Sequence, residues 1–484
     1  MIRLNASLAA HRRALDAGEY SSVELTRACL SEIESRDGAV GAFLTLDIAG
    51  ALQAAEQADL RRARGACLGA LDGIPYAIKD QFCTRGLRTT CASRMLENFI
   101  PPYDATVVEK LKQAGAVLLG KLNLDEFAMG SSGALSAFGA TKNPCDLTRS
   151  AGGSSSGSAA AVAANFAPFT IGSDTGGSIR QPAAFCGVVG LKPTRGVISR
   201  YGMVAMASSL DCVGIVTRSP EDARTVLSVL VGRDERDATS VAHPTPAISV
   251  PNARAVPLRV AVVSEMMQPG VTSPAVLQAV RAATEALRAM GAEIGEISLP
   301  APDVALASYC VLSAAEAASN LARFDGVRYG RRSEHAEDLY SLYANSRAEG
   351  FGTEVKRRIL FGTYMLSEGN RALYYDAAVS ARESIRQGLF ERLSQYDLIL
   401  TPTAPTAAVT FGKKRSLAEQ RRADLCVVYA SLAGLPAVSI PYGKNDIGLP
   451  LAIQLTASPF AEGLLLSVAE RLAADERGGA YDHA

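Results

Sequence analysis

Ala151-Gly-Gly-Ser-Ser-Ser-Gly-Ser-Ala-Ala160 and Gly172-Ser-Asp-Thr-Gly-Gly-Ser-Ile-Arg-Gln-Pro182 are the two stretches that decide the fold. They lie within residues 130–215, where Gly, Ser and Ala dominate, a composition that is also typical of flexible linkers. Apolar runs interrupt this region at residues 159–164, 185–191 and 203–210. Because a linker needs no such runs, the pattern predicts a packed core in which backbone segments approach closely.

Helices and strands alternate in the part of the chain before this core. A capping box at Ser21–Glu24 begins a helix, and helical patterns continue to about residue 64. Residues 73–80 then read as a buried strand that ends in Lys79 and Asp80. A helix at 106–114 and a strand at 116–119 follow, so the pattern indicates a mixed sheet of the α/β class.

The same alternation continues after the core. Residues 235–256, rich in Pro, Ala and Ser, read as a surface connection. A strand at 258–263, a helix from Ser273-Pro274 to Gly291 and a strand at 292–299 then form a strand–helix–strand unit. A long helical stretch is predicted from about residue 312 to 395. Three further strands are predicted at residues 397–400, 437–441 and 451–455.

The charge balance and the cysteines narrow the class of protein. The chain of 484 residues holds 49 Lys and Arg against 49 Asp and Glu, so no excess of positive charge favours tight, direct binding to nucleic acid. Its nine cysteines include no C-x-x-C pair, which favours reduced thiols in a cytoplasmic protein over disulfides or a zinc site. We find no signal peptide and no uninterrupted run of about 18 apolar residues that would span a membrane.

Neither glycine cluster matches a nucleotide-binding motif. No lysine follows either cluster as a phosphate loop requires, and neither cluster reads G-x-G-x-x-G. A Gly-Ser cluster alone more often forms a turn than an active site. Gly176-Gly177-Ser178 could, however, turn successive backbone N–H groups toward one point, which would hold an oxyanion beside a serine nucleophile.

A serine nucleophile needs a base, and the usual base is histidine. The four histidines stand away from any Gly/Ser-rich or strand-end context, which disfavours a Ser-His-Asp triad: His11, His243, His335 and His483. Lysine can take the role where burial lowers its pKa. Lys79 follows five apolar residues and suits such burial, although a lysine that ends an apolar strand is often a surface residue.

Together, Gly152–Ala159 and Gly172–Pro182 resemble the amidase signature family, whose members use a Lys–cis-Ser–Ser triad. The resemblance implies that Lys79 is the general base and that Ser154, after a cis peptide bond, is the bridging serine. Ser178 is then the nucleophile. The implied oxyanion hole consists of four backbone N–H groups, those of Thr175, Gly176, Gly177 and Ser178.

The family also implies an architecture. One domain over residues 1–484 is expected, with a central, mixed and twisted β-sheet flanked by helices on both faces. Within it, residues 1–64 would form an N-terminal helical segment and residues 65–215 the signature core with the triad. Residues 216–484 would supply the rest of the sheet and the substrate-recognition residues.

Within that family, the likeness is greatest to the glutaminase subunits of aspartyl/glutamyl-tRNA amidotransferases. It implies that Tyr309, Arg358 and Asp424 bind glutamine, since an arginine can pair with the α-carboxylate and an aspartate with the α-ammonium. The ammonia would pass to partner subunits B and C, which would bind the tRNA and use ATP and Mg²⁺. This chain itself would need no metal or organic cofactor. Without the resemblance, Arg358 and Asp424 would read as surface charges.

Four departures from that group leave two alternatives open. Residues 131–136 lack the usual polar side chains, Ser431 stands in place of Asn, Cys145 in place of Trp, and residues 370–373 replace a tyrosine-rich stretch. One alternative is a stand-alone amidase that acts on another small amide with the same triad. The other is a non-catalytic scaffold, against which the intact Lys79, Ser154 and Ser178 argue.

Overall fold

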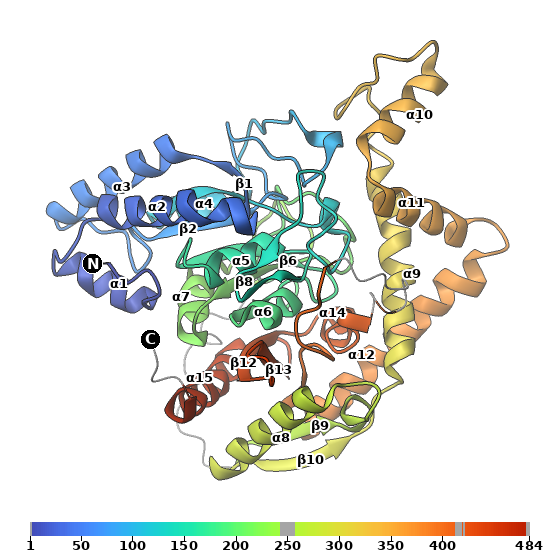
Figure 1. Ribbon diagram of the computed structural model, residues 1–484. Coiled ribbons are helices and arrows are strands. Elements are labelled where there is room, and N and C mark those ends of the chain that lie inside the picture. The colour runs from blue at the N-terminus through green and yellow to red at the C-terminus, as the bar shows by residue number, and fades with distance from the viewer. Residues whose placement is uncertain (1, 243–256, 412–418, 420–421, 481–484) are drawn as a thin grey trace.

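The sheet at the centre of the molecule has eleven strands and carries helices on both faces (Figure 1). The structure is a computed structural model that describes residues 2–242, 257–411, 419 and 422–480. His243 and His483 lie outside the described residues. The strand order in the sheet is β1-β3-β2-β6-β8-β7-β12-β13-β11-β9-β10, and β4 and β5 form a separate two-stranded ribbon.

The strands have the following bounds: β1 Phe43–Leu46, β2 Pro75–Lys79, β3 Val117–Leu122, β4 Lys142–Asn143, β5 Asp146–Ser150, β6 Phe169–Asp174, β7 Val189–Lys192, β8 Cys212–Thr217, β9 Arg259–Val263, β10 Glu293–Ile297, β11 Leu398–Pro402, β12 Ala437–Lys444 and β13 Pro450–Ala457. The helices have the following bounds: α1 Leu8–Asp16, α2 Ser22–Val40, α3 Ile48–Ala63, α4 Thr106–Gln113, α5 Ser156–Ala163, α6 Arg180–Cys186, α7 Pro220–Leu230, α8 Pro274–Ala289, α9 Pro302–Leu321, α10 Leu339–Gly350, α11 Thr353–Leu366, α12 Ala377–Gln395, α14 Val428–Ala433 and α15 Glu462–Ala480, with short helical turns η1 Arg94–Leu96, η2 Glu126–Ala128, η4 Ser264–Met267, η5 Ala372–Asp376 and η6 Arg422–Asp424.

Both kinds of strand pairing occur, which confirms the predicted mixed α/β sheet. Strand β2 pairs in parallel with β3 and β6, and β9 pairs in parallel with β10 and β11. The strands between these two groups pair antiparallel. Side chains alternate across the sheet, so Tyr76 and Ile78 belong to one apolar cluster, with α4, α7 and α15, while Ala77 belongs to another, with α3, α5 and α6.

The Gly/Ser-rich region is core rather than linker, as predicted. It supplies β6, β7 and β8 at the centre of the sheet, and α5 and α6 on one face. Residues 151–162 and 166–186 are buried throughout. Ala, Ser and Gly make up all of α5 except Val162, because larger side chains would hold the backbones apart.

Two predictions at the level of elements were incomplete. The N-terminal segment contains the edge strand β1 as well as helices; its four residues are all half-buried, so no alternation of apolar and polar residues marks it. The long helical stretch begins at residue 302 and divides into α9, α10, α11 and α12. Helix α9 is the one described helix apolar and long enough to cross a membrane, and its packing against α11 and α12 explains that composition as core.

Candidate active site

The edge of the sheet where β2 and β6 end brings Lys79 into contact with Ser154 and holds the loop of Ser178 next to them. Because β2 and β6 are neighbouring parallel strands, their carboxyl ends meet at one edge. Lys79 is the last residue of β2, and β6 leads through Asp174 into the loop that carries Ser178. Ser154 lies on the loop that enters α5 from the same region.

The amine of Lys79 is fully buried and has two hydroxyl neighbours. Its Nζ lies 2.8 Å from Ser154 Oγ and 2.8 Å from Ser173 Oγ. Burial lowers the pKa of Lys79 to about 7, against the opposing charges of Asp125, Asp211 and Asp174. A substantial fraction of this amine is therefore neutral near pH 7 and can accept a proton.

The three carboxylates near Lys79 are buried and are satisfied by hydrogen-bond donors. Asp125 accepts the N–H groups of Ser132, Gly133 and Leu135, so it holds the 131–135 loop. Asp211 accepts the hydroxyl of Thr175 at 2.7 Å. Because these anions stay at fixed positions, they stabilise an ammonium at Lys79 when it forms.

The two serines lie on tightly held loops. The peptide bond between Gly153 and Ser154 is cis, as the resemblance implies. Asp125 N–H donates to Ser154 O, and Ser155 N–H donates to Ser178 O, each at 3.1 Å. Ser178 is 6% exposed whereas Ser154 is 0% exposed, so Ser178 is the serine that a substrate can approach.

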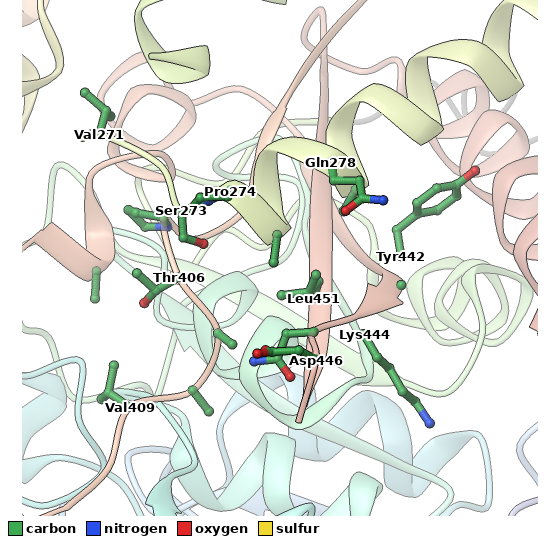
Figure 2. Close-up of a pocket in the computed structure, with 18 of the residues that line it drawn as sticks. Val271, Ser273, Pro274, Gln278, Thr406, Val409, Tyr442, Lys444, Asp446 and Leu451 are labelled. Atoms are coloured by element: carbon green, nitrogen blue, oxygen red, sulfur yellow. The ribbon is translucent and has the colours of Figure 1, made fainter. Parts of the chain in front are cut away.

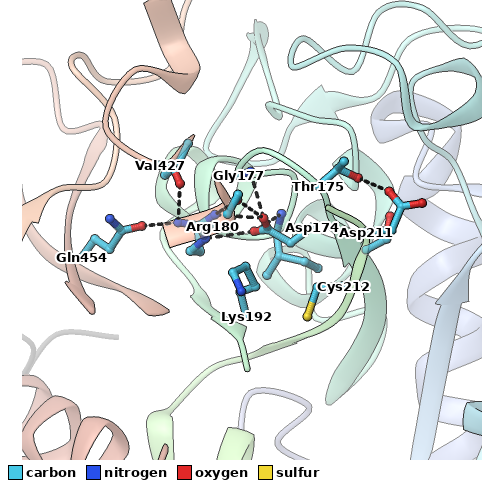
Figure 3. A network of polar contacts seen from close by, with 12 residues as sticks. Asp174, Thr175, Gly177, Arg180, Lys192, Asp211, Cys212, Val427 and Gln454 are labelled. Carbon is cyan, nitrogen blue, oxygen red and sulfur yellow. Dashed lines mark hydrogen bonds and ion pairs between the residues drawn. The ribbon is translucent and has the colours of Figure 1, made fainter. Parts of the chain in front are cut away.

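A buried ion pair fixes the loop before Ser178 (Figure 3). Arg180 donates from Nε and Nη2 to the two carboxylate oxygens of Asp174, at 3.0 and 2.9 Å. Its other N–H groups donate to Val427 O, Gln454 Oε1 and Ser431 Oγ. Burial opposes ionisation of Asp174, but the charge and hydrogen bonds of Arg180, the charge of Lys192 and the N–H of Gly177 together outweigh it and lower the pKa of Asp174 to about 2. Ser431, one of the departures noted above, thus completes this network.

The same carboxylate changes the expected oxyanion hole. Gly177 N–H, predicted as one of its donors, instead donates to Asp174 Oδ1 at 2.9 Å. A backbone N–H directed at a carboxylate inside the protein is not directed at a substrate. The N–H groups of Thr175, Gly176 and Ser178 remain the proposed donors, and Gly177 has a structural role in turning the loop at φ 114°.

Tyr309 connects this loop to the predicted substrate-binding residues. A Cβ at Gly176 would lie 2.2 Å from the Tyr309 ring, so only glycine allows the ring to cover the loop. Tyr309 also lines a pocket of about 70 Å³ together with Arg358 and Asp424. These three residues come from α9, α11 and η6, and the structure brings them together as predicted.

Arg358 has donor capacity to spare in this pocket. Its Nε donates to Glu354 Oε1 at 2.8 Å, and Arg357 also pairs with Glu354. Arg358 is 7% exposed, and its Nη1 is buried without a hydrogen-bond partner among the residues that the structure describes. A buried guanidinium with an unused donor suits an anionic ligand group.

Figure 2 shows a second, larger pocket, and no triad residue lines it. Its volume is about 1310 Å³, and Ser273, Thr406, Lys444 and Asp446 are among its lining residues. Val409 and Ala423 line both pockets, so the larger pocket adjoins the smaller one. No triad residue lines the smaller pocket either, but Tyr309 lines it and packs against Gly176 in the loop before Ser178, so we assign substrate binding to the smaller pocket.

Several site residues were not predicted from the sequence. Ser173 and Gln81 contact Lys79 directly or through one another, and Glu354 pairs with Arg358. No local pattern indicated Gln81, because β2 ends at Lys79 and Gln81 lies in the turn that follows. Among residues 2–242, 257–411, 419 and 422–480, no group of His, Cys, Asp and Glu side chains is arranged as a metal site.

Comparisons with known proteins agree with this geometry. The sequence profile of the family described as Amidase matches residues 24–466. The A subunit of the glutamyl-tRNA(Gln) amidotransferase of Symbiobacterium thermophilum is 49% identical over 456 residues, which are 94% of this chain and 93% of that protein. The corresponding protein of Moorella thermoacetica is 50% identical over 458 residues, again 94% of this chain and 93% of that protein.

Solved structures show the same likeness in three dimensions. The A subunit of the glutamyl-tRNA(Gln) amidotransferase of Thermotoga maritima superimposes with a TM-score of 0.79 at 37% identity, covering 100% of this chain and 97% of its own. A native peptide amidase of Stenotrophomonas maltophilia superimposes with a TM-score of 0.81 at 29% identity, covering 98% and 97%. By profile, by sequence identity over nearly its whole length and by fold, the chain belongs to the amidase family of enzymes, which includes these amidotransferase subunits.

Proposed function

We propose that this chain is the glutaminase subunit of a heteromeric amidotransferase. It would release ammonia from glutamine for the transamidation of misacylated Glu-tRNA(Gln) or Asp-tRNA(Asn), held by partner subunits B and C in the cytoplasm. The observation that carries the proposal is the buried Lys79 amine 2.8 Å from Ser154 Oγ, beside a pocket that presents Arg358 and Asp424. The identity of about half of all residues to the A subunits of two amidotransferases supports it.

The proposed reaction begins with a proton relay. Ser178 Oγ attacks the side-chain amide carbon of glutamine while its proton passes to Ser154, and the Ser154 proton passes to the neutral amine of Lys79. The N–H groups of Thr175, Gly176 and Ser178 would hold the oxyanion. The proton then returns to the leaving nitrogen, the C–N bond breaks and ammonia departs. Water later releases glutamate from the acyl-enzyme by the same relay.

The pocket would recognise the α-substituents of glutamine. Arg358 would pair with the α-carboxylate and Asp424 with the α-ammonium, while the Tyr309 ring covers the loop before Ser178. We propose that this half of the reaction uses no metal or organic cofactor of its own, and that ATP and Mg²⁺ serve a partner subunit.

The pKa of Lys79 predicts how the rate depends on pH. The active form of the amine is the neutral one, which dominates above its pKa of about 7 and is lost as the pH falls. We expect kcat/KM for glutamine to fall about tenfold per pH unit below pH 7 and to level off above it. A profile measured from pH 5 to 9, with the folded state checked by circular dichroism at each pH, tests this. A rate independent of pH over that range would contradict the role of Lys79.

Partner dependence tests whether the chain works as one component of a complex. Purified chain, alone and after co-expression with subunits B and C of a related amidotransferase, is assayed for glutamate release. We expect weak turnover alone and an increase of at least about tenfold in the complex, because partner contacts would order the substrate pocket. Equal turnover in both preparations would argue against membership of a complex.

A stand-alone amidase is the second candidate function. The pocket of about 1310 Å³ that adjoins the smaller one through Val409 and Ala423 favours it, since glutamine needs no such space. The altered residues 131–136, which fold over Asp125 beside the site, favour it as well. Fast hydrolysis of a larger primary amide by the chain alone, with slow hydrolysis of glutamine, would establish this alternative.

A further inference from the structure

Ser173 and Gln81 form a short hydrogen-bonded chain that ends on the amine of Lys79. Ser173 Oγ lies 2.8 Å from Lys79 Nζ and 2.7 Å from Gln81 Oε1, and Gln81 Nε2 lies 2.6 Å from Val204 O. Ser173 and Lys79 are fully buried, and Gln81 is 1% exposed. These contacts stand beside the serine relay and have no part in it.

The direction of each hydrogen bond in this chain follows from its far end. A backbone carbonyl can only accept, so the group of Gln81 that faces Val204 O must be the amide nitrogen. The amide oxygen therefore faces Ser173, and it too can only accept. The single hydrogen of the Ser173 hydroxyl is thus committed to Gln81.

The orientation of the Ser173 hydroxyl determines which hydrogen bond Lys79 makes with it. Since its hydrogen is used, Ser173 Oγ meets the amine as an acceptor, and Lys79 must donate one N–H to it. A neutral amine has two N–H groups and one lone pair. With one N–H fixed on Ser173, the lone pair is free to face the other neighbour at 2.8 Å, Ser154 Oγ.

We propose that Gln81 and Ser173 are positioning residues that keep the lone pair of Lys79 available for the proton of Ser154. Gln81 prevents the Ser173 hydroxyl from turning its own hydrogen onto that lone pair. The proposal rests on the proposed role of Lys79 as base and deepens it. No new covalent step is involved: one proton moves from Ser154 to Lys79, and Ser173 and Gln81 keep their hydrogens throughout.

The backbone around this chain supports a positioning role. Ser155 Oγ donates to Ser173 O at 2.9 Å and accepts Ser173 N–H at 3.3 Å, so the strand cannot shift at this point. Val204 N–H donates to Gln81 O at 3.0 Å, which clamps Gln81 to the 204 loop from both sides. The two side chains therefore have fixed partners and little freedom to rearrange.

A double-mutant cycle tests the proposal, with kcat and KM for glutamine as readouts. Ser173→Ala removes the acceptor, and we expect kcat to fall about tenfold with KM unchanged. Gln81→Met removes the group that restrains the hydroxyl, which then blocks the lone pair, and we expect kcat to fall about 100-fold. The double variant has no blocking hydroxyl, so its kcat should recover to the level of Ser173→Ala.

A Ser173 hydroxyl that blocks the lone pair of Lys79 should also change the dependence of kcat on pH. A hydroxyl that donates to the lone pair stabilises the neutral amine, so the acid limb of kcat should move to lower pH in Gln81→Met. Thr170→Val is the matched control, because Thr170 is a buried hydroxyl on the same strand that donates to Ser158 O instead. Its kcat should stay within about twofold of the unaltered chain.

The proposal would be overturned if the decreases in kcat of the two single variants add in the double variant. It would also be overturned if a folded Gln81→Met variant kept the full kcat. If Ser173→Ala does not fold, as judged by thermal denaturation, the Gln81→Met variant alone tests the proposal, through its kcat and the position of the acid limb of its pH profile. Failure of the proposed function is separate: full activity in Lys79→Ala would remove the base itself. An inactive Lys79→Ala together with additive losses would reject only the positioning of the lone pair.

Discussion

Replacing Lys79 with alanine is expected to abolish acyl-enzyme formation while the fold is kept. No other described group with a pKa near 7 lies within hydrogen-bonding distance of Ser154 Oγ, so nothing replaces the lost base. We expect single-turnover release of ammonia from glutamine to fall at least about 1000-fold. The sheet should be kept, because Lys79 is the last residue of β2 and its backbone pairing with β3 does not depend on the side chain.

Two controls make this result specific. Lys112→Ala removes an exposed lysine that pairs with Asp104 and should leave the rate unchanged. Labelling by a fluorophosphonate probe should be lost in Ser178→Ala and strongly slowed in Lys79→Ala, since the probe needs the same activated hydroxyl. Normal labelling in Lys79→Ala would show that Ser178 has another base.

The parts of the site that were predicted are those where chemistry dictates local sequence. A lysine after five apolar residues suggests a buried amine, and the structure buries it completely. The two glycine–serine stretches had to be core because apolar runs accompany them; the first leads into α5, and the second begins at the end of β6 in the middle of the sheet. Strand β2 was found for the same reason, since burial on both faces leaves a continuous apolar run.

The parts that were missed depend on contacts between distant segments. Gly177 N–H seemed available from the sequence, but the position of Asp174 within the folded loop takes it. Nothing near Gln81 in the sequence indicates that Val204 O lies 2.6 Å from its amide and thereby sets its orientation. The edge strand β1 was missed because four half-buried residues carry too little pattern, and its partner β3 lies far along the chain, with Leu46 paired to Gly120.

The substrate pocket could not be predicted from the local sequence pattern. Tyr309, Arg358 and Asp424 were assigned only through a family resemblance, because Arg358 follows two basic residues and reads alone as a solvated charge. The fold buries that charge on α11 and places Glu354 beside it, so one donor set of the guanidinium is occupied and another is left for a ligand. The position of an unused donor is a property of packing, and only the folded chain shows it.

Arg358→Ala is expected to raise KM for glutamine strongly while kcat changes much less. A buried, charge-assisted pair with the α-carboxylate is worth about 2–5 kcal/mol when one partner is removed, so KM should rise about 30-fold or more. Steady-state kinetics with glutamine measure this. Lys356→Ala is the matched control, since it removes a positive charge two residues away on the exposed side of α11 and should leave KM unchanged.

A second substrate decides what Arg358 recognises. The amide 4-aminobutanamide keeps the side-chain amide and the amine of glutamine but lacks the α-carboxylate. If Arg358 binds that carboxylate, the unaltered chain and Arg358→Ala should hydrolyse this amide with the same low kcat/KM. An equal loss on both substrates would mean that Arg358 instead supports the pocket through Glu354, and an unchanged KM for glutamine would point to a different substrate. Because the two substrates differ only in the carboxylate, the ratio of their losses isolates the ion pair from any general disturbance of α11.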